Sequence, residues 1–245
     1  MVVTGTGTGV GKTVVTAALA AAAAAQGHTV AVLKPAQTGV CADEPGDVAE
    51  VVRLTRGTAH GVELARFPDP LAPATAARRA GLPPVGPEQA AHAARELART
   101  HDLVLVEGAG GLLVHLDDRG GTVADVAGLL GAPVLVVAAA GLGTLNATAL
   151  TAEALRARGL ECAGVVVGSL PESPGLAERC NLTDLPTVCG APLRGVLPQG
   201  AAEMEDFSGR APGWLAPQLY GSWHAPYAPR AAYDEPVSAG GVRPA

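Results

Sequence analysis

Apolar residues occur along this chain in two patterns, as short continuous runs and as longer segments with apolar positions three and four residues apart. The short runs predict buried parallel strands at residues 1–3, 29–33, 62–67, 103–106, 133–138, 162–167 and 193–197. The longer segments predict helices at residues 12–26, 47–55, 71–80, 88–100, 122–130, 146–158 and 207–215. Because strands and helices alternate, we expect a single α/β domain, with a mostly parallel sheet and helices on both faces.

The composition of the chain changes near residue 218. Two of the three Tyr, one of the two Trp and several Pro fall between Gly221 and Ala245, without periodicity. We therefore predict one packed domain over residues 1–217 and a poorly ordered C-terminal tail over residues 218–245.

A glycine-rich loop stands between the first predicted strand and the first predicted helix, and it reads Gly5-Thr6-Gly7-Thr8-Gly9-Val10-Gly11-Lys12-Thr13. Glycines permit a tight turn in which successive backbone N–H groups point at phosphate oxygens, and the following helix dipole favours the same anion. The loop is a variant P-loop, because Thr6 occupies the first position of the G-x-x-x-x-G-K-[ST] pattern. Lys12 is predicted to reach the β- and γ-phosphates of a nucleoside triphosphate, and the Thr13 hydroxyl to bind Mg²⁺.

Two charged residues directly follow predicted strands. Lys34 comes after residues 29–33, and Glu107 comes after residues 103–106 and before a glycine-rich stretch. The carboxyl ends of parallel strands meet at the edge of the sheet where ligands bind, so Glu107 is predicted to reach the same Mg²⁺ as Thr13. Taken alone, Lys34 also fits a surface lysine whose stem lies on apolar neighbours, and Asp47 fits an acid at a helix N-terminus.

Composition excludes several other classes of function. The net charge of −6 argues against a nucleic-acid surface. The six His are scattered and the four Cys form no C-x-x-C pair, so neither a zinc site nor a disulfide scaffold is predicted, and reduced thiols are expected. The apolar stretch 14–25 is too short to span a bilayer. We expect a cytoplasmic enzyme with no membrane partner.

Four motifs in order give the chain a family resemblance. These are Gly-Thr-x-Thr-x-Val-Gly-Lys-Thr, Lys-Pro-x-x-Thr-Gly, Glu-Gly-Ala-Gly-Gly, and Gly-Thr-Leu-Asn before a helix. Over roughly residues 1–216 the chain resembles the dethiobiotin synthetase family of P-loop NTPases. The resemblance implies ATP-dependent closure of a ureido ring on 7,8-diaminopelargonate with CO2, in biotin biosynthesis. The implied intermediates are a carbamate and a carbamic–phosphoric anhydride.

The resemblance also implies a role for individual residues. Lys34 and Lys12 match catalytic positions, and Thr13, Asp47 and Glu107 match the Mg²⁺ ligands. The implied nucleotide-binding residues are Thr8, Gly9, Val10, Gly11, Lys12, Thr13, Asp47, Glu107, Gly108, Ala109, Gly110, Gly168, Ser169, Leu197, Pro198 and Gln199. The implied substrate-binding residues are Thr38 and, across a homodimer interface, Gly143, Thr144, Leu145 and Asn146, where a helix N-terminus suits the substrate carboxylate.

The sequence departs from the pattern of some family members at two places. Gly9 stands where those members carry an acid, and Gly168-Ser169 stand where others carry Asn-Asp that read the adenine edge. A missing side-chain partner weakens discrimination among bases, which predicts broader nucleotide use that includes CTP.

Three alternative functions make different demands on the sequence. A regulatory ATPase of the cell-division or plasmid-partitioning type carries a signature lysine where this chain has Gly7, and it carries a basic amphipathic helix that is not found here. An amidating synthetase of the cobyrinate type needs a glutaminase domain, for which the chain has no room. A nucleotide-binding protein without chemistry predicts no product from diaminopelargonate.

Overall fold

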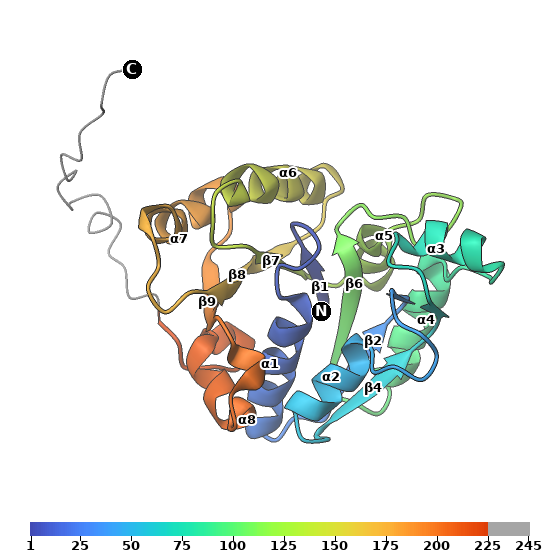
Figure 1. Ribbon diagram of the computed structural model, residues 1–245, viewed down its shortest axis with the longest axis horizontal. Coiled ribbons are helices and arrows are strands. Elements are labelled where there is room, and N and C mark those ends of the chain that lie inside the picture. The colour runs from blue at the N-terminus through green and yellow to red at the C-terminus, as the bar shows by residue number, and fades with distance from the viewer. Residues whose placement is uncertain (225–245) are drawn as a thin grey trace, which may run out of the picture.

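A seven-stranded sheet forms the centre of the molecule in a computed structural model, which describes residues 1–224 (Figure 1). Its strands are β1 (Val2–Gly5), β2 (Val30–Lys34), β4 (Ala59–Glu63), β6 (Leu103–Gly111), β7 (Val134–Ala138), β8 (Cys162–Leu170) and β9 (Leu193–Pro198). They lie in the order β4-β2-β6-β1-β7-β8-β9, and every neighbouring pair is parallel. The α/β fold class with a parallel sheet is confirmed.

Helices cover both faces of the sheet, as the all-parallel arrangement requires. One face carries α1 (Lys12–Ala25), α2 (Asp47–Leu54) and α8 (Phe207–Arg210), and the other carries α4 (Pro87–Leu97), α5 (Val123–Leu130), α6 (Thr144–Ala157) and α7 (Leu176–Cys189). Side chains alternate between these faces, so Val3 packs in the cluster under α1 while Val2 packs with α4 and α5. Residues 17–23 of α1 are all buried and mostly Ala, which lets the helix lie close to the sheet.

A smaller unit adjoins this sheet. Strands β3 (Gln37–Thr38) and β5 (Arg66–Phe67) pair in parallel, and α3 (Pro73–Ala80) packs on them through Phe67 and two alanines. The sequence predicted a single strand at 62–67, but the structure divides this region between β4 and β5. It also predicted that the third helix begins at residue 71. Pro73 instead occupies the first turn, where its missing N–H costs nothing, and residues 70–72 stay outside the helix, with the Leu71 N–H bonded to the Asp69 carbonyl at 2.9 Å.

Other boundaries also differ from the prediction. Strand β6 continues through Gly111, so Glu107 lies within the strand and not beyond its end. Helix α6 begins at Thr144, two residues earlier than predicted, because Gly143 before it adopts a left-handed backbone (φ 88°). Helix α7 was not predicted at all. It has an internal Pro186 and a buried Asn181 that donates to the carbonyls of Ala140 and Gly141, so its sequence shows no clean amphipathic period.

The packed chain continues past the predicted domain end at residue 217. A 3₁₀ turn, Pro217–Leu219, buries Leu219, and Tyr220 packs against the core. The rest of the predicted tail, residues 225–245, lies outside the described residues. Across residues 1–224, none of the helices has the length and apolarity to cross a membrane.

Candidate active site

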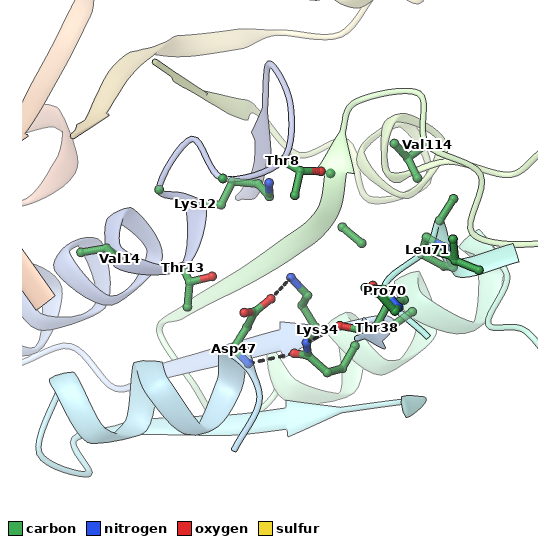
Figure 2. A pocket seen from close by; sticks show the side chains of 18 residues that line it. Thr8, Lys12, Thr13, Val14, Lys34, Thr38, Asp47, Pro70, Leu71 and Val114 are labelled. Atoms are coloured by element: carbon green, nitrogen blue, oxygen red, sulfur yellow. Dashed lines mark hydrogen bonds and ion pairs between the residues drawn. The ribbon is translucent and has the colours of Figure 1, made fainter. Parts of the chain in front are cut away.

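A cavity of about 720 Å³ opens at the carboxyl edge of the sheet, beside the ends of β1, β2 and β6 (Figure 2). Its lining residues are Thr8, Gly9, Gly11, Lys12, Thr13, Val14, Lys34, Ala36, Gln37, Thr38, Asp47, Pro70, Leu71, Ala72, Pro73, Ala109, Gly110 and Val114. The four segments that the sequence singled out at residues 8–13, 34–38, 47 and 107–110 therefore converge on one site. The edge of a parallel sheet where the strand order reverses is where such folds bind ligands.

The glycine-rich loop wraps around the ammonium group of Lys12. Gly9 and Gly11 adopt left-handed backbone conformations (φ 75° and 93°), and Lys12 Nζ donates to the carbonyl of Gly7 at 2.9 Å. Burial, and then the neighbouring Lys34 ammonium, lower the pKa of Lys12 below its ordinary 10.5. An anionic phosphate in the loop would offset both effects, so the loop is built for an anion.

Lys34 lies at the centre of a buried charge cluster. Its Nζ is 2.5 Å from Asp47 Oδ2 (Figure 2). It is also 2.7 Å from Glu107 Oε1, and it donates to the carbonyl of Gly108 at 3.3 Å. Burial lowers the pKa of Lys34, but the two carboxylates raise it further, so the net shift is upward from 10.5. The Lys34 ammonium is therefore a permanent cation at the floor of the cavity.

Glu107 is the feature that fits this site to a divalent cation. Its side chain is 1% exposed, and its Oε1 accepts from Thr13 Oγ1 at 3.1 Å as well as from Lys34. Within residues 1–224 its buried Oε2 makes no hydrogen bond, which is a costly state for a carboxylate. Two carboxylates, a hydroxyl and the phosphates of a nucleotide form the ligand set that Mg²⁺ takes in phosphoryl-transfer sites. The residues present fit Mg²⁺.

Gln37 links this cluster to the substrate side of the cavity, and sequence reasoning missed it. Its Oε1 accepts from the backbone N–H of Asp47 at 2.8 Å, and its Nε2 donates to the carbonyl of Thr38 at 3.1 Å. The side chain is 4% exposed, and Gly46 leaves the space that it fills. The signal available in the sequence was a glutamine between the predicted site residues Lys34 and Thr38.

The wall opposite the phosphate loop was also missed. It consists of Val114, residues 70–72 before α3, and Pro73 at the start of that helix. The sequence placed Leu71 in a helix and gave no role to Pro70 or Val114. Together with Thr38 they give the cavity an apolar side next to its charged floor.

The residues of β8 and of the end of β9 that were predicted to bind the nucleotide do not line this cavity, namely Gly168, Ser169, Leu197, Pro198 and Gln199. Gly168 lies directly against the phosphate loop, since a Cβ added there would fall 2.0 Å from the Val10 carbonyl oxygen. Ser169 is exposed, and Gln199 donates its backbone N–H to the Leu170 carbonyl at 2.7 Å. The Leu197 side chain is fully buried in the core. Nucleotide binding by these residues stays a prediction.

The residues predicted to meet the substrate carboxylate form the first turn of α6, away from this cavity. Gly143 and Asn146 are exposed, Leu145 packs in the cluster under α7, and the buried Thr144 Oγ1 makes no hydrogen bond within residues 1–224. In a homodimer with shared sites, these residues would lie at the partner's cavity. The structure describes one chain, so this assignment stays a prediction.

The curated proteins that are most similar in sequence to this chain belong to one family. A family model described as an AAA domain matches residues 1–203. The chain is 66% identical to the ATP-dependent dethiobiotin synthetase of Streptomyces avermitilis, over 92% of this chain and 95% of that protein. It is 72% identical to the protein of the same name from Saccharopolyspora erythraea, over 79% of this chain and 86% of that protein.

Solved structures that resemble the chain are more distant. The MinD cell division protein of Aquifex aeolicus aligns with a TM-score of 0.53 and 16% identity, over 86% of this chain and 85% of that one. A ParA family ATPase from Chlorobium tepidum aligns with a TM-score of 0.52 and 14% identity, over 86% and 90%. At such identity these likenesses show the fold alone.

Proposed function

The chain belongs to the ATP-dependent dethiobiotin synthetase family, and we propose that its cavity closes the ureido ring of dethiobiotin on 7,8-diaminopelargonate with CO2. The observation that carries this proposal is the position of Lys34, a buried permanent cation between the phosphate loop and the apolar wall. A regulatory ATPase of the cell-division type would carry its second lysine in the phosphate loop, where this chain has Gly7, whereas the second lysine of this chain is Lys34 at the floor of the cavity.

The proposed reaction joins two anions before it closes a ring. One substrate amine takes up CO2 as a carbamate, and a carbamate oxygen attacks the γ-phosphorus of the nucleotide. The second amine then attacks the carbonyl carbon of the carbamic–phosphoric anhydride, and inorganic phosphate leaves. Carbamate and triphosphate repel each other, so the approach needs fixed positive charge at the point of contact.

Lys12 and Lys34 supply that charge from opposite sides of the contact. Lys12 would hold the phosphate oxygens in place of its present partner, the Gly7 carbonyl. Lys34 would hold the carbamate and the transferred phosphoryl group. Both ammonium groups are buried by the protein, so water does not screen them, and they do not reorganise during the reaction.

Thr13, Asp47 and Glu107 are the proposed ligands of Mg²⁺, which when bound would neutralise charge on the β- and γ-phosphate oxygens. The orphaned Oε2 of Glu107 supports this assignment. Asp47 is 36% exposed toward the cavity and lies at the N-terminus of α2, where a carboxylate is favoured.

Weak discrimination among bases is also proposed. The backbone contact between Gly168 and the phosphate loop leaves no room for a base-reading amide at position 168. The comparison of kcat/KM for ATP, CTP, GTP and UTP tests this point, and a large preference for ATP would reject it.

A homodimer is proposed as the working assembly, because the first turn of α6 is otherwise far from the cavity. Leu142, next to this turn, is 90% exposed, and Leu150 on the same helix is 59% exposed. Sedimentation of the purified protein tests the assembly. Asn146→Ala would raise the KM for diaminopelargonate and leave the nucleotide KM unchanged if this turn binds substrate.

The deciding experiment is a product assay. Purified protein is mixed with 7,8-diaminopelargonate, bicarbonate, Mg²⁺ and either ATP or CTP, and dethiobiotin is detected by mass spectrometry, with Lys34→Ala as the matched negative control. Product from the wild type alone supports the proposal. A folded wild type that binds ATP but yields no product with either nucleotide would point to a regulatory ATPase.

A further inference from the structure

Two cysteines lie in contact at the end of the sheet opposite the cavity. Cys162 is the first residue of β8, and Cys189 is the last residue of α7, just before the turn into β9. Their Sγ atoms are 3.7 Å apart, although 27 positions separate them in sequence. Neither residue has a part in the proposed reaction, so the contact needs its own explanation.

The surroundings of the pair combine access on one side with burial on the other. Cys189 is 2% exposed and packs in the cluster under α7, whereas Cys162 is only partly buried. Solvent therefore reaches Cys162 more readily than Cys189. Arg156 lies beside the pair and donates from Nη1 to the Cys189 carbonyl at 3.3 Å.

The two sulfurs also differ in acidity. The Cys189 thiol, as a hydrogen-bond donor, lowers the pKa of Cys162 to about 7, and the Arg156 guanidinium adds to this effect while burial and Glu161 oppose it. The same contact and burial raise the pKa of Cys189. Cys162 is thus the thiolate that an oxidant would meet first, and Cys189 is a protonated thiol held next to it.

We propose that Cys162 and Cys189 form an oxidation site at which a hydroperoxide produces an intrachain disulfide. The Cys162 thiolate attacks the terminal peroxide oxygen, which breaks the O–O bond and gives a sulfenic acid and an alcohol or water. The Cys189 thiol then attacks the Cys162 sulfur, the S–O bond breaks, and water leaves with the thiol proton. Two thiols are oxidised by two electrons, and one hydroperoxide is reduced.

The two sulfurs must come closer for this bond to form. They are 3.7 Å apart, and a disulfide holds its sulfurs about 2.05 Å apart. The bond would join the start of β8 to the turn before β9 and close a loop over residues 162–189. Closing a loop of this length restricts the unfolded chain, and we expect the melting temperature to rise by about 5–10 °C.

Cys41 offers an internal comparison, since it is exposed but lies on a loop before α2. If exposure alone decided oxidation, Cys41 would react before Cys162. The proposal predicts the reverse order for disulfide formation, because the Cys189 thiol lies 3.7 Å from the Cys162 sulfur.

The test treats the full-length protein with increasing hydrogen peroxide and maps its peptides without reduction. The expected result is a linked peptide that joins Cys162 to Cys189, the loss of two titratable thiols, a higher melting temperature, and reversal by dithiothreitol. Cys189→Ala should stop the reaction at a sulfenic acid on Cys162, which dimedone traps, while Cys41→Ser should change nothing.

Other results would overturn the proposal. Wild-type protein in which Cys162 accumulates as a sulfenic or sulfinic acid without the crosslink would show that the two sulfurs do not meet. Linked peptides that involve Cys41, or crosslinks between chains in place of the 162–189 bond, would do the same. The wild-type peptide map decides the matter even if a variant fails to fold.

Discussion

The polar side chains at the two edges of the parallel sheet differ in their burial and in their hydrogen bonding. At the carboxyl edge, Lys34 and Glu107 are 3% and 1% exposed, and a carboxylate oxygen is left without a hydrogen bond within residues 1–224. At the amino edge, Asp102 and Thr29 are exposed and satisfy each other through three hydrogen bonds of 2.7 to 3.0 Å.

The difference separates function from structure. Burying a charge costs free energy unless the charge is fully paired. A buried charge cluster that is only partly satisfied therefore indicates a function and not a contribution to stability. Exposed and mutually satisfied groups need no such reason. Perturbing the carboxyl edge should therefore cost activity, whereas perturbing the amino edge should cost only stability.

The largest expected effect is that of Lys34→Ala. The variant loses the cation that offsets repulsion between carbamate and γ-phosphate, and we expect kcat to fall by about 10³-fold. Nucleotide affinity, measured by titration with a fluorescent analogue, should stay within about threefold because Lys12 and the loop N–H groups remain.

The matched control for this change is Arg53→Ala, which removes an exposed ion pair with Glu50 (2.6 Å). Surface pairs contribute little, so kcat and nucleotide affinity should both be unchanged. Near-normal turnover in Lys34→Ala would remove this lysine from the mechanism.

The second effect concerns the backbone contact that supports the phosphate loop. In Gly168→Ala the new methyl group would fall 2.0 Å from the Val10 carbonyl oxygen, so the loop must move. A displacement of about 1 Å in a catalytic site can cost about 100-fold in rate, and we expect a loss of that order in kcat/KM for every nucleotide.

Gly213→Ala serves as the control for Gly168→Ala, because an added Cβ at Gly213 meets no atom within 4 Å. If Gly168→Ala bound nucleotide as tightly as the wild type, the β8 backbone would have no part in shaping the loop.

The sequence located the charged residues of this cavity and missed most of the others, for a physical reason. Lys34 and Glu107 directly follow apolar runs and Lys12 ends the glycine-rich loop, so local pattern alone brings them to one edge of the sheet. Gln37, Pro70 and Val114 reach the cavity through pairing between distant segments, as β3 and β5 show, and no local period records such contacts.

The same distinction explains the errors in the fold. Strand β8 contains a continuous apolar run, and both β8 and helix α6 were predicted with boundary errors of a few residues. Helix α7 depends on tertiary hydrogen bonds, since Asn181 donates to two carbonyls on another segment, and its pattern did not predict it.

A third, smaller effect is expected at Gln37, which positions Asp47 without touching the reacting atoms. Gln37→Met keeps the volume but removes the acceptor for the Asp47 N–H and the donor to the Thr38 carbonyl. Groups that orient a metal ligand typically affect metal affinity about 10-fold or more. We expect the Mg²⁺ concentration for half-maximal activity to rise by about that factor, with a smaller change in kcat at saturating Mg²⁺.

The control for Gln37→Met is Gln89→Met at an exposed position on α4. Equal loss of kcat at all Mg²⁺ concentrations would show that Gln37 supports the fold in general and not Asp47 in particular.

The smallest effect is expected at the amino edge, with Asp102→Asn. The backbone N–H of Thr29 and then its hydroxyl lower the pKa of Asp102 below 3.8, so its carboxylate stabilises the fold above that pH. This contribution disappears as the pH falls through the lowered pKa, because both states then bind the proton. We therefore expect Asp102→Asn to melt a little below the wild type at pH 7, with the difference closing as the pH falls below 3.8, and kcat at pH 7 to be unchanged. Asp43→Asn, which alters an exposed acid on the loop before α2, should show no difference at either pH. A fall in kcat for Asp102→Asn would contradict the separation of the two edges, because a change at the amino edge would then affect the reaction at the carboxyl edge.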